Sequence, residues 1–152
     1  ARCWGLWVEG RLAAFCGMMY RPKARRRRRT PPIMGVSRVV TLPDFQGLGL
    51  AFVLLDAMAS VYAAVGRRVR NYPAHPPFVR ACGRSKNWAL VKKPGVFSHV
   101  NVSRGNVGGM GGRPCAVFEY VGPAIERVQA REILQWWVRA RENQPLELTL
   151  DI

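Results

Sequence analysis

Apolar residues recur along the first third of the chain with the spacing of strands. Residues 3 to 8 and 12 to 20 are rich in apolar side chains and are separated by Glu9-Gly10, which predicts a hairpin of two strands. Residues 36 to 42 are again dominated by β-branched and large apolar side chains, and they stop at Pro43. We therefore expect a third strand that ends at this proline.

From Leu48 the apolar spacing changes to that of a helix. Apolar residues fall at positions i, i+3, i+4 and i+7, and the pattern ends at Gly66, which predicts one long helix. Shorter elements follow. We expect strands at residues 67 to 72, 89 to 91 and 115 to 121, a short helix at 78 to 84, and a C-terminal helix at about 123 to 141.

Two segments between these elements have the composition of loops. Residues 21 to 35 carry a block of five consecutive arginines, which cannot pack together and must be solvated. Residues 92 to 114 are rich in glycine, which predicts a long flexible loop. The chain has 152 residues, 49% hydrophobic content and no apolar run of membrane-spanning length. We therefore expect a single domain, residues 1 to 152, and no membrane partner.

The most informative segment joins the third strand to the long helix. Glycines at alternate positions leave backbone amides uncovered at a helix N-terminus, where the helix dipole favours an anion. A phosphate site is one interpretation of this turn. The alternative is that the glycines only let two backbones approach closely. The residues concerned are Gln46, Gly47, Leu48, Gly49, Leu50 and Ala51.

This segment, R-V-V-T-L-P-D-F-Q-G-L-G-L-A at residues 38 to 51, resembles the acetyl-CoA signature of the GNAT (Gcn5-related) N-acetyltransferase superfamily. That signature is Gln or Arg, two residues, Gly, one residue, then Gly or Ala. Gln46, Gly49 and Ala51 match it. The order of strands and helices resembles the same family over about residues 3 to 121, although only the signature is a specific match.

The resemblance implies a fold and a cofactor. The fold is α/β (α+β), with a mixed, mostly antiparallel central sheet flanked by helices. The cosubstrate is acetyl-CoA, and no metal is implied. In such a fold the residues of the third strand, Val39, Val40 and Thr41, would face the pantetheine arm, while the turn from Gln46 to Ala51 would hold the pyrophosphate.

One departure from the family concerns the start of the chain. The family has a strand and two helices before the hairpin, whereas here the hairpin begins almost at residue 1. The front elements are therefore expected to be missing. This chain is then a fragment or a reduced member, or its C-terminal helix, with Trp136 and Trp137, covers the surface that those elements would cover. A larger chain and a homo-oligomer both stay open.

Acetyl transfer to an amine needs a polarised carbonyl, a base for the amine and a proton for the departing thiolate. The resemblance implies that the amide of Val40 or Thr41 polarises the carbonyl. It also implies a tyrosine donor after the short helix, but residues 75 to 88 contain no tyrosine, and Ser85 is the nearest hydroxyl. This departure indicates a slow enzyme or a substitute donor.

Few residues could serve as the base. His75 follows the strand at 67 to 72, and imidazole titrates near neutral pH, so His75 is one candidate. The alternative is that it only shapes a proline turn. Glu119 lies within an apolar strand, where a carboxylate is either paired with arginine in a structural role or acts in the acceptor site. Asp44 is expected to cap the long helix.

Charge points to a second type of partner. Lys and Arg number 24 against 9 Asp and Glu, which gives a net charge of +15. The excess is either a solvated surface that also serves the phosphates of CoA, or a binding surface for DNA or RNA. Trp88, flanked by lysines, is a candidate base contact, although core packing is the usual role of tryptophan. The arginine block that would bind phosphates comprises Arg25, Arg26, Arg27, Arg28 and Arg29.

The four cysteines are dispersed and form no metal-binding spacing, which predicts buried free thiols and a cytoplasmic location. Together these features predict an acetyl-CoA-dependent N-acetyltransferase that modifies a primary amine on or near nucleic acid, either a modified base or a nucleic-acid-bound protein. The same enzyme could instead modify a protein lysine, an N-terminus or a polyamine, although the positive charge disfavours a polyamine. The alternative is a catalytically weak GNAT-like module that binds nucleic acid or a partner protein.

Overall fold

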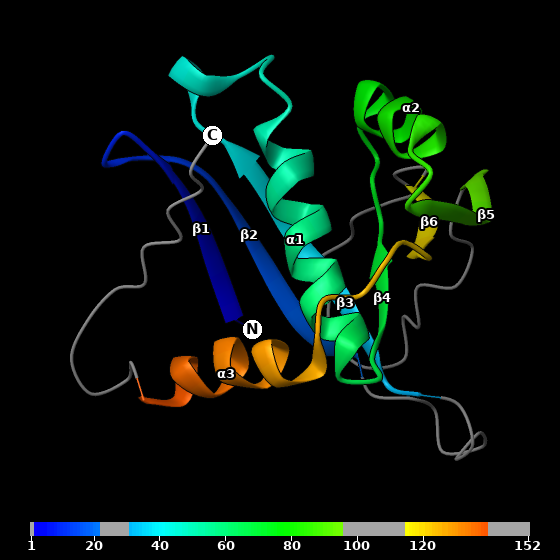
Figure 1. The fold of residues 1–152 in the computed structure, drawn as a ribbon. Helices are drawn as coiled ribbons and strands as arrows, with labels where there is room; N and C mark the ends of the chain where they lie inside the picture. The colour runs from blue at the N-terminus through cyan, green and yellow to red at the C-terminus, as the bar shows by residue number, and fades with distance from the viewer. Residues whose placement is uncertain (1, 22–30, 96–114, 140–152) are drawn as a thin grey trace, which may run out of the picture.

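The structure is a computed structural model, and it describes residues 2–21, 31–95 and 115–139 (Figure 1). The side chains of residues 136–139 lie outside this description, so the expected cover by Trp136 and Trp137 does too. The elements in chain order are β1 (Arg2–Val8), β2 (Arg11–Arg21), β3 (Ile33–Thr41), the 3-10 helix η1 (Pro43–Phe45), α1 (Leu50–Ala64), β4 (Arg68–Asn71), α2 (Pro76–Arg84), β5 (Trp88–Gly95), β6 (Cys115–Tyr120) and α3 (Arg127–Arg139).

Six strands form one sheet in the order β1-β2-β3-β4-β6-β5. Every neighbouring pair is antiparallel except β3 and β4, which are parallel. The predicted α/β class with a mixed, mostly antiparallel sheet is therefore confirmed. In the described part of the chain β1 is an edge strand.

The parallel pair β3–β4 is short. Residues 33–35 of β3 pair with residues 68–70 of β4, and beyond them the two strands are no longer paired. Helix α1 packs over this region and contacts β1, β2, β3 and β4. Its buried residues Leu54, Leu55 and Met58 form the centre of the core. The sheet is thus open at one end of its central strand pair.

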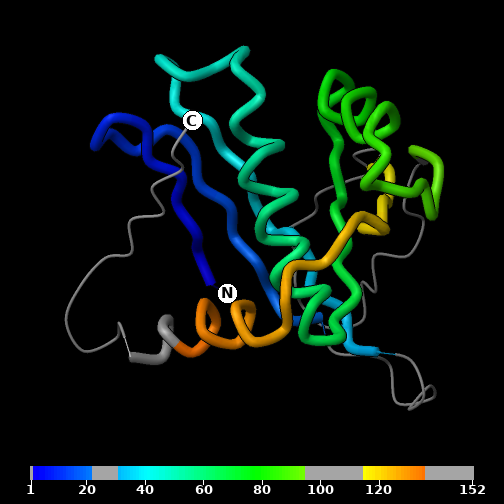
Figure 2. Tube along the Cα trace, viewed as in Figure 1, coloured from blue at the N-terminus to red at the C-terminus, as the bar shows by residue number. Residues whose placement is uncertain are grey.

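Helix α3 lies across one end of the molecule, below the C-terminal half of α1 (Figures 1 and 2). Its Ala130 is fully buried in the core, which ties the helix to the sheet and α1. The predicted helix is confirmed in existence, but its start at residue 123 is wrong. Residues 122–125 are irregular, and the Tyr120 hydroxyl donates a hydrogen bond to the Pro123 carbonyl at 2.9 Å.

Three other local predictions are wrong. The loop predicted at residues 21 to 35 is too long at both ends, because Arg21 ends β2 and residues 33–35 begin β3. Residues 92 to 95 are not loop, because they continue β5, where Lys92 pairs with Val117 and Gly95 with Cys115 across two irregularities of register. Pairing with β6 therefore overrides the glycine and proline composition there. Asp44 does not cap α1, because it pairs with Arg11, and the N-cap residue is Gly49 with no side-chain cap.

The cysteine side chains are free, as predicted, but they are not all buried. Cys3 is exposed and Cys115 is half-buried, whereas Cys16 and Cys82 are buried. Burial, with a smaller contribution from Cys3, raises the pKa of the Cys16 thiol to about 12. Burial likewise raises the pKa of Cys82 to about 11. These two thiols are therefore protonated at neutral pH and serve as core residues.

Candidate functional site

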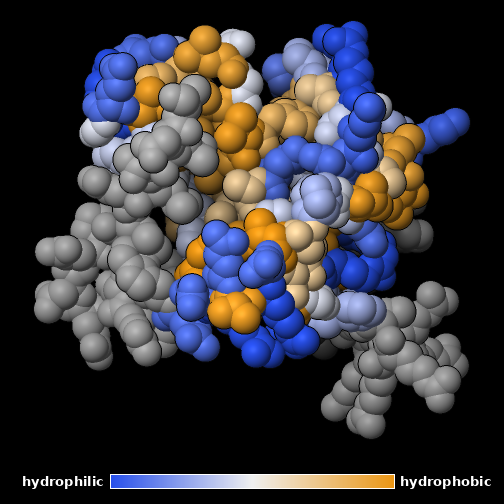
Figure 3. All heavy atoms as spheres, in the orientation of Figure 1, coloured by the Kyte–Doolittle hydropathy of each residue, from blue (hydrophilic) through white to orange (hydrophobic). Residues whose placement is uncertain are grey.

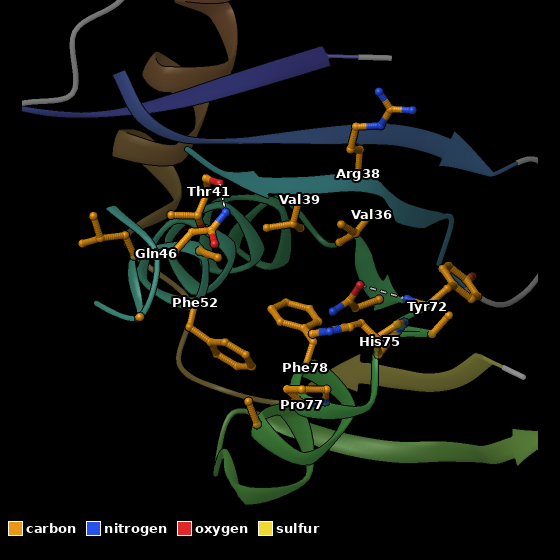
Figure 4. A pocket seen from close by; sticks show the side chains of 18 of the residues that line it. Val36, Arg38, Val39, Thr41, Gln46, Phe52, Tyr72, His75, Pro77 and Phe78 are labelled. Carbon is orange, nitrogen blue, oxygen red and sulfur yellow. Dashed lines mark hydrogen bonds between the residues drawn. The ribbon is translucent and has the colours of Figure 1, made fainter. Parts of the chain in front are cut away.

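A cavity of about 830 Å³ lies where β3 and β4 separate (Figure 4). We call it the glycine-turn cavity. Its walls come from β3, the turn that follows, the first turn of α1, the end of β4 and the start of α2. The lining residues are Val36, Ser37, Arg38, Val39, Thr41, Phe45, Gln46, Gly47, Gly49, Leu50, Ala51, Phe52, Asn71, Tyr72, Pro73, Ala74, His75, Pro77, Phe78 and Ala81.

The backbone of β3 presents alternate residues to this cavity. The Leu42 N–H donates to the Ala13 carbonyl at 2.9 Å, so Leu42 bonds toward β2. Because hydrogen-bonding direction alternates along an antiparallel pair, Val40 also bonds toward β2, whereas Val39 and Thr41 direct their amides and carbonyls away from it. The expected use of the Val40 amide therefore does not fit this geometry. Val39 and Thr41 hold the groups that face the gap.

The glycine turn leaves donors uncovered at the other end of the cavity. Gly47 and Gly49 adopt φ of 83° and 75°, a left-handed conformation that favours glycine. No heavy atom beyond the adjacent residues lies within 4 Å of the position that a Cβ would take at either glycine. In the described part of the chain, the amides of Leu50 and Ala51 in the first turn of α1 have no hydrogen-bond partner. These features fit a bound phosphate.

Aromatic side chains form the apolar side of the glycine-turn cavity. The rings of Phe52 and Phe78 lie 5.0 Å apart between centroids, at an interplanar angle of 51°. Figure 4 shows both rings near Val39, facing the same space. The cavity therefore combines an unpaired strand edge, an apolar wall and a cluster of uncovered amides, which is the combination that a long ligand with a phosphate at one end requires.

His75 and Tyr72 bring titratable groups to the lining. His75 is the N-cap residue of α2, and its carbonyl accepts a hydrogen bond from the Val79 N–H at 2.9 Å. Its side chain is exposed and lines the cavity. The Tyr72 ring lies under the Arg21 guanidinium, 4.7 Å from its centroid. Sequence reasoning missed Tyr72, although its place at the end of a strand that leaves its neighbour was a usable signal.

The other predicted cofactor residues divide between the lining and the outside. Gln46 lines the cavity, and its side-chain amide donates to the Thr41 carbonyl at 3.4 Å, which ties the turn to β3. Val40 and Leu48 are not among the lining residues. Leu48 is 66% exposed and forms the outer surface of the turn. The structure thus brings together most of the predicted donor site.

Ser85 lies outside the glycine-turn cavity. It is the C-cap residue of α2, and its amide donates to the carbonyls of Ala81 and Cys82. Its hydroxyl oxygen accepts a hydrogen bond from the Asn87 N–H at 3.2 Å. These contacts describe a helix terminus, and they leave the predicted acid without a place in the cavity.

Glu119 also lies outside the cavity, held between two arginines. Arg68 donates to both carboxylate oxygens, at 2.8 and 2.6 Å, and Arg70 donates to one of them at 2.8 Å. Burial alone would raise the pKa of Glu119, but the hydrogen bonds and charges of these arginines outweigh it and lower that pKa. These contacts agree with the structural, arginine-paired interpretation of Glu119.

The structure contradicts the expected base contact at Trp88. The ring is 4% exposed, packs edge-on against Tyr120, and donates from Nε1 to Asp56 at 2.6 Å. It therefore belongs to the core. Arg25 to Arg29 lie outside the described residues. Among the residues that are described, no three His, Cys, Asp or Glu side chains are grouped to bind a metal ion, and no helix has the length and apolar content needed to cross a membrane.

The sheet has one parallel strand pair, which opens beside the glycine turn. No family model matches the sequence, and no curated protein matches it either. Solved structures do match. The ribosomal-protein-S18-alanine N-acetyltransferase from Escherichia coli is 14% identical, with 82% of this chain and 70% of that chain covered and a TM-score of 0.50.

A second similar structure is NAA60 from Arabidopsis thaliana in complex with a bisubstrate analogue. It is 17% identical, with 72% of this chain and 64% of that chain covered and a TM-score of 0.50. A GNAT-family acetyltransferase from Streptococcus pneumoniae is 11% identical and has a TM-score of 0.49, with coverage of 76% and 64%. The chain therefore spans slightly under two thirds of two of these proteins. The predicted GNAT-like fold is confirmed.

Proposed function

We propose that the protein is an acetyl-CoA-dependent N-acetyltransferase that modifies a primary amine. The observation that carries this proposal is the glycine-turn cavity, where an unpaired strand edge leads to uncovered amides at the start of α1. Acetyl-CoA, when bound there, would supply an acetyl group activated as a thioester. The residues of the chain would then bind and orient the two substrates and transfer protons.

Binding divides between the two ends of the cavity. Val39 and Thr41 would hydrogen-bond the amides of a pantetheine arm, as an added strand would. The amides of Leu50 and Ala51 would hold the pyrophosphate, helped by the dipole of α1. Phe52 and Phe78 would exclude water from the apolar part of the ligand. The pantetheine arm would thus lie along β3, and the pyrophosphate would lie at the start of α1.

Proton transfer is assigned to the two titratable side chains of the lining. His75 would accept the proton of the attacking amine, because its exposed imidazole lies on the cavity wall. Tyr72 is the only phenol among the described lining residues, and its hydroxyl would return a proton to the leaving thiolate. Ser85 and Glu119 receive no catalytic role, because their hydrogen bonds lie elsewhere.

The acceptor amine is proposed to be on or near nucleic acid, on a modified base or on a bound protein. The support is the net charge of +15, which attracts phosphates at any sequence. A catalytically weak module that binds nucleic acid or a partner protein is the second candidate, favoured by the absence of Ser85 from the cavity. Labelled acetyl-CoA, incubated with RNA, DNA and lysine peptides, separates the two. Acetylation of any of them excludes the second candidate.

The donor site is tested by Gly49→Val, with Gly66→Val as the matched control. Both glycines have φ near 75° and open space at the Cβ position, and they lie at opposite ends of α1. Backbone strain is therefore shared, but only the side chain at Gly49 would cover the phosphate amides. We expect Gly49→Val to weaken CoA binding about hundredfold by calorimetry, the loss of about two charge-assisted hydrogen bonds. Equal affinity in the two variants would overturn the donor site.

A further inference from the structure

A second cavity, of about 520 Å³, lies at the other end of β3, where β3 and β4 are paired. We call it the arginine cavity. Its lining residues come from the start of β1, the end of β2, the start of β3, the end of α1 and the first half of α3. Figure 1 shows how these elements are arranged. It shares no lining residue with the glycine-turn cavity. No part of the proposed acetyl transfer accounts for it.

Four arginines line this cavity, from three parts of the chain far apart in sequence: Arg2, Arg67, Arg127 and Arg131. No Asp or Glu is among the described lining residues, and the salt bridges of the described residues involve none of Arg67, Arg127 and Arg131. Like charges held around one space repel each other. A bound anion would attract each arginine and so offset this repulsion.

The nearest comparison is the neighbouring Arg68. It follows Arg67 directly in sequence, yet its guanidinium donates to both oxygens of Glu119. Arg68 is therefore paired with a carboxylate, whereas Arg67 lines the arginine cavity. Figure 3 shows hydrophilic residues gathered over α3 with apolar residues between them. Arg127 and Arg131 lie within the first five residues of this helix. Arg67, Arg127 and Arg131 are exposed, so their charges face solvent.

The floor of the arginine cavity is apolar. Met18, Met34 and Tyr62 are buried, at 0%, 8% and 3% exposed. At the rim, Tyr20 is 55% exposed, so its ring is open to a ligand. A positive rim around an apolar floor, with an exposed ring beside it, matches a ligand that has both a planar apolar part and phosphates.

We propose that the arginine cavity binds a nucleotide unit, with its base on the Tyr20 ring and its phosphates on Arg67, Arg127 and Arg131. Free nucleotides and single-stranded nucleic acid share this chemistry. The inference rests on the nucleic-acid part of the proposed function and deepens it, but it does not depend on acetyl transfer. The cavity would hold the nucleic acid while the glycine-turn cavity holds the donor.

The test measures fluorescence anisotropy of a labelled single-stranded RNA of about 12 nucleotides, a length typical of such sites. Excess CoA is present throughout, because CoA itself contains a nucleotide and should occupy its own cavity. The variant is Arg127→Gln with Arg131→Gln. The matched control is Arg80→Gln with Arg84→Gln, which removes the same charge from the exposed arginines of α2.

We expect the α3 variant to bind the RNA about tenfold more weakly at physiological salt, and its slope of log affinity against log salt to fall by about 1.4, for two lost phosphate contacts. The control should stay within about twofold of the parent protein, because α2 contributes no residue to the arginine cavity. An equal loss in both variants would show general charge attraction and overturn the site.

Tyr20 provides a readout that charge alone would not move. Tyr20→Ala should weaken RNA binding about tenfold through lost stacking, and Tyr20→Phe should retain it. Competition with a nucleoside monophosphate then separates the two sources of ligand. Full displacement at concentrations near those of the RNA identifies a free-nucleotide site, and weak displacement identifies a nucleic-acid site.

Two further measurements keep the outcome clear if a variant is poorly folded. Crosslinks from a photoreactive RNA to the parent protein should map to Tyr20 or to residues 127 to 131, and crosslinks confined to other segments would overturn the site. Calorimetry should show unchanged CoA binding in the Arg127→Gln, Arg131→Gln variant. RNA binding at this cavity in a protein that fails to bind CoA would contradict the donor assignment alone.

Discussion

The two ends of β3 present anion-binding chemistry in opposite ways. Where β3 leaves β4, the glycine-turn cavity offers backbone amides and few charges. Where β3 pairs with β4, the arginine cavity offers four guanidinium groups above an apolar floor. The first would recognise an anion through the direction of N–H groups and a helix dipole, and the second through charge.

This difference has consequences for specificity. Amides fixed in a turn hold one geometry and lose little entropy on binding, so they suit a defined ligand. Exposed arginines adapt to many phosphate positions and depend on ionic strength, so they suit a polymer. The contrast predicts that salt should weaken RNA binding far more than CoA binding. The variants below test each side of it.

The largest effect is expected from a proline scan of β3. Val40→Pro removes an amide that bonds to β2, and it should lower the free energy of unfolding by about 3 kcal/mol, the cost of the bond and of an unsatisfied carbonyl. Val39→Pro removes an amide that faces the cavity and should cost less stability but more CoA affinity. Urea unfolding and calorimetry measure the two. A reversed order of stability would contradict the alternation on which the donor site depends.

The next effect concerns turnover. His75→Gln should lower kcat about hundredfold, the usual contribution of a general base, with CoA affinity unchanged. Ser85→Ala is the control, because its hydroxyl bonds to Asn87 away from the cavity, and both kcat and KM should stay at the parent values. Initial rates with the acceptor found by labelling give the comparison. A loss in the Ser85 variant alone would restore the serine as the proton donor.

A smaller effect on stability should come from the ion pairs of Glu119 with Arg68 and Arg70. Glu119→Gln leaves two arginines without their carboxylate and should cost about 2 kcal/mol of stability at neutral pH. Since the folded pKa of Glu119 lies below the ordinary value of about 4.5, its contribution is complete above that value and is lost as the pH falls through the lowered pKa. The stability difference between parent and variant should therefore shrink below pH 4.5. A difference that is constant with pH would exclude the ion pair as its source.

The sequence predicted the strand, turn and helix around the glycine-turn cavity because that segment is local. The strand, the proline, the glycines and the start of the helix lie within residues 36–51, and each follows from turn chemistry or periodicity. The positions of Val40 and Leu48 could not be predicted, since they depend on which side of β3 pairs with β2. Trp88 was misplaced because flanking lysines do not indicate that Asp56, far away in sequence, would receive its indole N–H.

The arginine cavity could not be predicted for a related reason. Its residues come from β1, the end of α1 and the start of α3, and no local pattern connects Arg67 with Arg127. The same holds for Glu119. Whether this carboxylate pairs with Arg68 or stays free for the acceptor site depends on the antiparallel register of β4 and β6. Contacts between distant segments fix these environments, whereas propensity fixes the turn.

The irregularity in β3 at Ser37 determines which residues of β3 face the glycine-turn cavity. Gly17 pairs with Arg38 and Met18 with Val36, so Ser37 is an extra residue. Its hydroxyl donates to the Gly17 carbonyl at 3.0 Å, in space that a Cβ at Gly17 would enter. Before it the even-numbered Met34 and Val36 face the core, and after it the odd-numbered Val39 does. One inserted residue thus exchanges the sides that even- and odd-numbered residues of β3 face. It thereby decides which amides of β3 a ligand can reach.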